Sequence, residues 1–205
     1  MHARSVGTTP YELARDPSNY PIESILAAAD LASRLDPHST PDLVEKMHDR
    51  DSSVRYWAAL GLMIRGKAAA SQGAAALKQA LADDSPSVRI AAAQCLAQYG
   101  NEEQAAVALE TLGNLVDPNR NGVLVSMSAL AAVEALGSQA ASLHPAIASL
   151  QSSGPASDPR NAPDPRYDSY VPRLIANIVS EPESTQPESP KPKKPKGKAG
   201  KQPSK

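Results

Sequence analysis

The strongest constraint on the fold is an internal repeat of 34 residues in the middle of the chain. Asp49, Asp83 and Asp117 follow one another at this step. The same step joins further pairs: Leu43 and Leu77, Val54–Arg55 and Val88–Arg89, Ala58–Ala59 and Ala92–Ala93, Leu62 and Leu96, and Gly66 and Gly100. A fixed period of this length indicates stacked supersecondary units, each burying a face against its neighbour.

The third copy of the repeat is shifted. Val125 and Gly137 lie 37 residues beyond Val88 and Gly100, which we attribute to an insertion in the turn at 117–122.

Each unit has the pattern of two helices. Apolar residues recur at every fourth position in two matching stripes, namely Val54, Ala58, Leu62 and Val88, Ala92, Leu96. Glycine follows each such helix, and we expect these glycines to be C-terminal stops in the left-handed conformation: Gly66, Gly100 and Gly137. The patterns predict helices over 21–34, 40–48, 52–66, 72–82, 86–100, 102–116, 122–137, 141–151 and 170–180.

Composition supports an all-α fold. Thirty-five of the 205 residues are Ala and only seven are aromatic, which disfavours the strands of a sandwich or barrel. No run of eighteen apolar residues occurs, so we expect no membrane span, and the start lacks the apolar core of a secretory signal. The predicted architecture is a short right-handed α-solenoid of antiparallel helix pairs with a disordered C-terminal tail.

The predicted organisation has five parts. A linker-like segment covers 1–19, a solenoid of about 3.5–4 helix pairs covers 20–152, and a loop covers 153–167. A terminal helix at 168–180 precedes a Lys/Pro-rich tail at 181–205, which has no large apolar residue and which we expect to be disordered.

The tail is basic while the rest of the chain is acidic. Its lysines are candidate contacts to a polyanion through counterion release, although a merely solvated tail is the interpretation we favour: Lys191, Lys193, Lys194, Lys196, Lys198, Lys201 and Lys205.

A turn Asp followed five and six residues later by Val-Arg, at the start of an Ala-rich helix, resembles HEAT and HEAT-like repeats. Asp49-Val54-Arg55 and Asp83-Val88-Arg89 have this spacing, whereas the third unit has Gly122 and Val123 at those places. The resemblance implies a stacked ladder of Asp and Arg along the array, made by Asp49, Arg55, Asp83, Arg89 and Asp117. The period also suits tetratricopeptide repeats, but their aromatic pattern is missing.

A narrower resemblance covers roughly residues 8–180. The strings at 10–16, 20–32, 54–61 and 84–93 resemble the HEAT-like C-terminal extension of bacterial sulfatases similar to heparan N-sulfatases. A sulfatase needs the pattern C/S-x-P-x-R, which neither Cys95 nor Ser157 provides. The resemblance therefore implies a detached extension without its catalytic domain.

The residues themselves indicate no catalysis and no cofactor. No two of the four His are three to five residues apart, so a helical His pair for a metal is not expected. Acidic pairs such as Asp83-Asp84 and Glu102-Glu103 fit helix capping better than acid–base chemistry. We interpret Trp57 first as a core residue and second, with Tyr56, as a contact to a partner.

Three functions remain open at this point. The first is a non-catalytic module that binds protein, the partner being a sulfatase catalytic domain. The second is a fragment of a longer sulfuric-ester hydrolase, and the third is a free-standing scaffold whose tail binds a polyanion. The chain as written predicts a cytoplasmic protein, whereas membership of a sulfatase predicts a periplasmic or exported one.

Overall fold

Every regular element that the computed structural model describes is a helix. The description covers residues 20–150 and 170–180, together with Thr9, Glu12 and Arg15. The longer helices are α3 (Ile22–Ser33), α5 (Ser52–Ile64), α8 (Pro86–Tyr99), α9 (Glu102–Leu115), α11 (Val123–Leu136) and α13 (Tyr170–Ser180). The shorter ones are η1 (Pro37–Ser39), α4 (Thr40–Lys46), α6 (Lys67–Gln72), α7 (Ala74–Ala80), α10 (Pro118–Asn121), η2 (Gly137–Leu143) and α12 (His144–Ala148).

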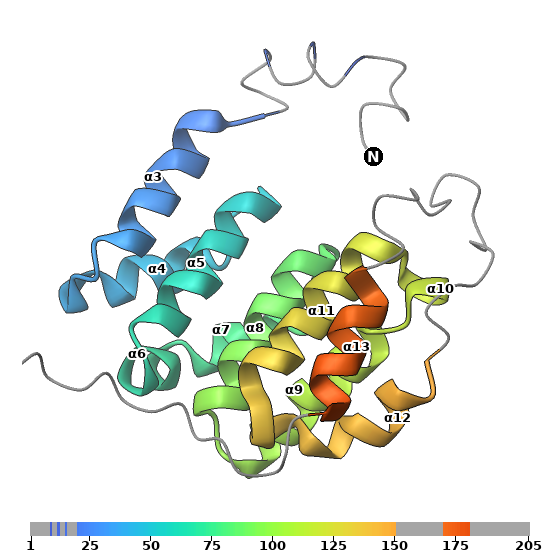
Figure 1. Ribbon diagram of the computed structural model, residues 1–205. Coiled ribbons are helices and arrows are strands. Elements are labelled where there is room, and N and C mark those ends of the chain that lie inside the picture. The colour runs from blue at the N-terminus through green and yellow to red at the C-terminus, as the bar shows by residue number, and fades with distance from the viewer. Residues whose placement is uncertain (1–8, 10–11, 13–14, 16–19, 151–169, 181–205) are drawn as a thin grey trace, which may run out of the picture.

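The helices form two layers, as a solenoid requires (Figure 1). In the first layer α3, α5, α8, α11 and α13 pack side by side in chain order. The second layer consists of α4, α6, α7, α9 and α12, and each of its longer members packs on a helix of the first layer. The expected all-α solenoid is therefore confirmed for the described part of the chain.

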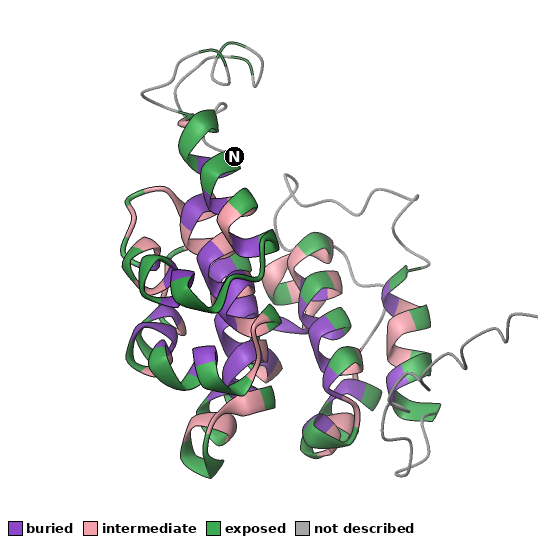
Figure 2. Cartoon of the chain, turned by 90° about the vertical axis from the view of Figure 1, so that its left-hand side faces the viewer, coloured by how far each residue is buried: buried purple, intermediate pink, exposed green. Residues whose placement is uncertain are grey.

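The core lies between the two layers. Leu43, Leu62, Leu77, Leu96 and Leu112 are fully buried there, and their neighbours are largely alanines. Figure 2 shows the buried residues on the inward faces of the helices and the exposed ones along their outer edges. Because alanine adds little bulk, the helices can approach closely, and the leucines are the large apolar side chains between them.

A second, smaller cluster joins α3 to the array. Ile25, Ala28 and Val54 are buried together, and Trp57 packs against them. The carboxyl end of α3 is held by Arg65, whose guanidinium donates to the carbonyl oxygens of Leu31 and Ala32 at 2.7 and 3.0 Å. These contacts fix the first layer at its N-terminal end.

The helices predicted from the sequence are observed with small differences in their bounds. Three short helices, η1, α6 and α10, are not predicted by the sequence patterns. The sequence of α6, Lys-Ala-Ala-Ala-Ser-Gln, has no apolar period because it is nearly all alanine. Helix α10 occupies the predicted insertion, and the Asp117 carboxylate accepts from the Asn119 N–H at its start.

The prediction for one of the three glycines is wrong. Gly66 and Gly137 do have positive φ, 78° and 52°. Gly100 has φ −70° and ψ 174°, which is extended backbone open to any residue. What favours glycine there is space, because an added Cβ would lie 2.5 Å from the Leu96 carbonyl oxygen and 2.9 Å from Gln104 Cβ.

Among the described residues, one helical stretch is long and apolar enough to cross a membrane, judged by length and composition alone. It runs over Val123–Ala148 with a mean hydropathy of 1.4. Such a stretch is weak evidence of a membrane span, because the core helix of a folded domain can have the same length and apolar composition. Here Gly137 interrupts the stretch with φ 52° and ψ −127°, and Leu130 and Val133 before it are buried in the core.

Candidate interaction surface

The turn before α5 is organised by its own aspartates. The Asp51 carboxylate caps the helix by accepting from the N–H groups of Ser53 and Val54 at 2.8 and 3.2 Å. The Asp49 carboxylate accepts from the Asp51 N–H at 2.8 Å. These three bonds satisfy backbone donors at the start of the helix, so contacts within the turn order it locally.

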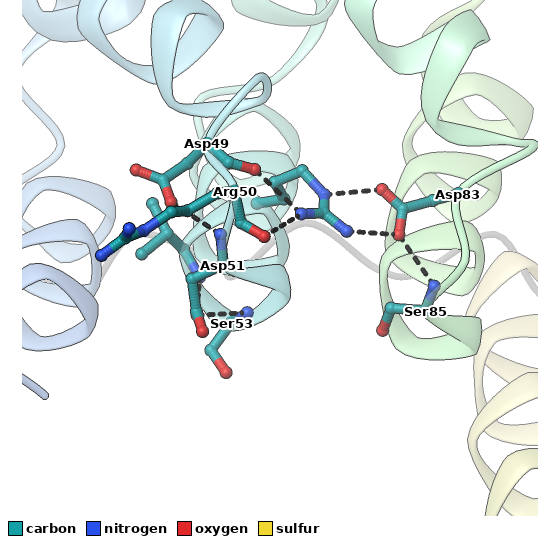
Figure 3. A network of polar contacts seen from close by, with 8 residues as sticks. Asp49, Arg50, Asp51, Ser53, Asp83 and Ser85 are labelled. Atoms are coloured by element: carbon teal, nitrogen blue, oxygen red, sulfur yellow. Dashed lines mark hydrogen bonds and ion pairs between the residues drawn. The ribbon is translucent and has the colours of Figure 1, made fainter. Parts of the chain in front are cut away.

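Arg55 connects this turn to the next one. Its Nε and Nη2 donate to the two carboxylate oxygens of Asp83 at 2.7 and 2.8 Å. Its Nη1 donates to the carbonyl oxygens of Asp49 and Arg50 at 2.8 and 3.0 Å. Figure 3 shows the two turns facing each other, with Asp49, Arg50 and Asp51 on one side and Asp83 with Ser85 on the other.

The pair is shielded from water, since the side chains of Arg55 and Asp83 are only 16% and 10% exposed. Burial alone would raise the pKa of Asp83. The hydrogen bonds from Arg55 and from the Ser85 N–H outweigh it, so the pKa of Asp83 lies below its ordinary value. The same bond to Asp83 raises the pKa of Arg55. The pair is therefore ionised and bidentate at neutral pH.

The next unit does not repeat this bridge. Arg89 stands 34 residues after Arg55, yet its Nε is buried and has no hydrogen-bond partner among the described residues. Asp117, the expected acceptor, has its carboxylate on the Asn119 N–H. The insertion that forms α10 lies between the two units and changes the register of the turn. Of the predicted ladder, the structure thus brings Arg55 and Asp83 together directly and includes Asp49 through its carbonyl oxygen.

Ser126 takes the arginine's place in the third unit. It lies 37 residues after Arg89, the same step that relates Val125 to Val88. The side chain is fully buried, and its hydroxyl donates to the Val116 carbonyl oxygen. Ser126 therefore keeps the bond from the helix to its own preceding turn and lacks the bridge to a further unit. The comparison of the Asp–Arg ladder uses the offset of 34, which places Val123 here, and the offset of 37 that relates Val125 to Val88 is the signal that would find Ser126.

A groove of about 530 Å³ crosses the exposed side of α5, α8 and α11. Its lining contains no charged side chain: Tyr20, Ile25, Ser52, Ser53, Tyr56, Trp57, Leu60, Ser85, Ser87, Ile90, Ala91, Gln94, Ser128, Ala131 and Ala132. The sequence repeat does not predict which residues meet in this groove. Most of them come from four helices, α3, α5, α8 and α11, that are separated in the sequence.

Tyr56 and Trp57 form the aromatic part of the groove. Their rings lie edge to face, with centroids 5.9 Å apart and an interplanar angle of 68°. One side of Trp57 packs on Ile25, Ala28 and Val54, while the rest of the residue lines the groove. The ring therefore serves the core and remains accessible, so both interpretations of Trp57 have a structural basis.

Outside the bridge and the groove, the described residues offer few side chains suited to catalysis or metal binding. No group of three or more His, Cys, Asp or Glu side chains there could hold a metal ion. Cys95 is buried in α8, and burial raises the pKa of its thiol to about 12. The thiol is thus neutral and a poor nucleophile. The candidate tail lysines, from Lys191 to Lys205, lie outside the described residues.

Residues 40–128 match the family model of HEAT repeats. The matched HEAT segment begins at α4 and ends within α11, so it contains the Arg55–Asp83 bridge, Arg89 and most of the groove. HEAT repeats commonly act as non-catalytic modules for protein–protein interaction, because a solenoid offers a continuous surface to its partners. No curated protein matches the chain. The narrower resemblance to a sulfatase extension stays a prediction.

Proposed function

We propose that this chain is a non-catalytic module that binds a protein partner along the groove on α5, α8 and α11. The observation that carries the proposal is the groove itself, which runs over successive HEAT helices and presents Tyr56 and Trp57. Aromatic side chains of this kind dominate binding energy at protein interfaces. The face of the array opposite the groove belongs to the second layer.

Rigidity of the groove supports the same proposal. The bridge from Arg55 to Asp83 fixes the spacing of α5 and α8 at their amino-terminal ends. Trp57 is held on its inner side by the cluster on α3. A partner therefore meets side chains that are already ordered, which lowers the entropy cost of association.

Site-specific photo-crosslinking in the source cell tests this function. A photoreactive residue at Gln94 lies in the groove, and the matched control at Gln79 lies exposed on α7 in the second layer. We expect a defined cross-linked species from Gln94 that is absent from Gln79 and disappears in the Trp57→Ala variant. Equal cross-linking from both positions, or none from Gln94, would contradict the proposal.

We also propose, from the resemblance alone, that the partner is a sulfatase catalytic domain. The strings at 10–16 and 20–32 carry that resemblance. Helix α3 offers a suitable contact at the N-terminal end of the array, since Ile22 and Leu26 are 41% and 60% exposed. An antibody against residues 20–150 would measure the mass of the native protein. A band near 21.5 kDa, combined with recovery of a separate sulfatase, supports a detached extension. A much larger band indicates the alternative, a sulfuric-ester hydrolase that includes this chain.

A second candidate function rests on the tail. Seven lysines and no acidic residue occur in the last seventeen residues, a composition that allows non-specific binding to a polyanion through counterion release. We expect residues 1–205 to elute from heparin at a higher salt concentration than residues 1–180. Equal elution would remove this function.

A further inference from the structure

The groove differs from most protein surface in having no charged residue in its lining. We propose that it receives an extended, proline-containing segment of the partner protein that carries no charged side chain where it crosses the groove. The inference rests on the proposed function and names the class of partner that this surface fits.

The ion pair beside the groove is already closed. Ser85 lines the groove, and its N–H donates to Asp83, which is bound at both oxygens by Arg55. Neither side chain is more than 16% exposed, so neither is free to pair with a ligand. A charged side chain that lies against the groove finds no counter-ion in the lining, which disfavours it relative to an uncharged one.

The polar groups in the lining suit the backbone of an extended chain. Ser53 on α5 and Ser87 and Gln94 on α8 bring hydroxyl and amide donors to the groove, whereas the Ser128 hydroxyl on α11 already donates to the Leu124 carbonyl oxygen at 3.0 Å. A polyproline II segment has carbonyl oxygens but few N–H groups, and it makes no internal hydrogen bonds. Donors spread along a groove, rather than a sheet edge, are what such a backbone needs.

The shape of the groove also fits proline. Tyr56 and Trp57 give an aromatic wall on α5, and aromatic-lined grooves are the common receptors of proline-rich segments. Ala91, Ala131 and Ala132 give the opposite end a floor of small side chains, which lets a backbone approach closely. Proline loses little conformational entropy on binding, so a shallow open groove can hold it.

The lysine-rich tail of this chain does not fit the same surface. Its prolines alternate with lysines from Lys191 to Lys198, and the lining offers no carboxylate to receive them. A flexible uncharged segment would lack the ring contacts and would lose more entropy. A lysine-containing peptide and a flexible uncharged peptide are therefore the controls.

Binding is measured on the full chain by the fluorescence of Trp57, which is its single tryptophan and lies in the groove. The probe is an oligoproline peptide with neutral ends. Matched peptides of equal length replace alternate prolines with lysine, with glutamate, or with alanine and serine. We expect saturable binding of oligoproline and at least about tenfold weaker binding of all three controls.

The matched variants are Ser128→Glu, which puts a charge on the exposed groove surface of α11, and Ser71→Glu, which puts it on exposed α6. Ser128→Glu should weaken oligoproline binding about tenfold with an unchanged melting temperature, and Ser71→Glu should not. Equal binding of the lysine or glutamate peptide, or of the alanine–serine peptide, would overturn the inference. Absence of all peptide binding together with cross-linking from Gln94 would overturn it while leaving the proposed function intact.

Discussion

The two junctions between successive repeat units are built differently although the sequence repeats across both. At the first, between α5 and α8, Arg55 crosses to Asp83 and closes a bidentate ion pair. At the second, between α8 and α11, Arg89 has a buried, unpartnered Nε, and Ser126 bonds to its own preceding turn. The repeated arginine therefore closes a bidentate bridge only at the first junction, although Arg89 also lowers the pKa of Asp83 through its charge.

The difference follows from the three extra residues of the third unit. They fall in the turn that contains the four-residue helix α10, whose start engages the Asp117 carboxylate. The arrangement leaves the second junction to apolar packing by residues such as Leu130 and Val133. The following experiments test whether the free energy of unfolding depends on the two junctions as unequally as these contacts indicate.

Arg55→Met should have the largest effect. The substitution leaves the carboxylate of Asp83 largely buried without its cation and frees two carbonyl oxygens in the preceding turn. We expect a loss of about 3 kcal/mol in the free energy of unfolding, measured by urea denaturation. The matched control is Arg50→Met at an exposed arginine of the same turn, which should change the value by less than about 0.5 kcal/mol.

Asp83→Asn should cost about 2 kcal/mol at neutral pH. Because the folded-state pKa of Asp83 is lowered, the wild-type carboxylate contributes its full stability above the ordinary value of 3.8. That contribution is lost as the pH falls through the lower folded-state pKa. Unfolding free energies of wild type and variant should converge as the pH is taken below 3.8. A difference that stays constant with pH would argue against the ion pair as its source.

Ser126→Ala should cost about 1–2 kcal/mol, because the carbonyl oxygen of Val116 would remain buried without its donor. Ser128→Ala on the exposed face of the same helix is the control and should be close to neutral. Thermal unfolding followed by circular dichroism compares the two. Equal effects would mean that the second junction does not depend on the Ser126 bond.

Arg89→Met should have the smallest effect. Replacing a buried donor that has no acceptor by an apolar side chain of similar length should change stability by less than about 0.5 kcal/mol, or raise it slightly. A loss comparable to that of Arg55→Met would show that the two junctions are equivalent in solution. That result would contradict the comparison.

Much of the fold could be predicted because the relevant signals are local. Apolar stripes such as Val54, Ala58, Leu62 place a helix and its buried face without knowledge of the neighbours. Helix α6 was missed because a run of alanines carries no such stripe. Gly100 was misassigned because its requirement is a close approach by Gln104, which depends on the following helix.

The site was less predictable for a related reason. The spacing of Asp83 from Arg55 follows the repeat, whereas the loss of the equivalent contact at Arg89 depends on how the insertion folds. The groove needs Tyr56, Gln94 and Ser128 to meet across three helices. Serines in helices give no pattern that indicates a shared surface before the helices are packed.

The chain contains its own reporter of fluctuations. Cys95 is the only cysteine, lies fully buried in α8, and has its thiol pKa raised to about 12. A disulfide reagent can therefore reach the Cys95 thiol only when the array opens, so the labelling rate measures how often such openings occur. Helix α8 lies between the two junctions. Comparing the labelling rate of Cys95 with the rate of global unfolding therefore shows whether the units separate one at a time or all together.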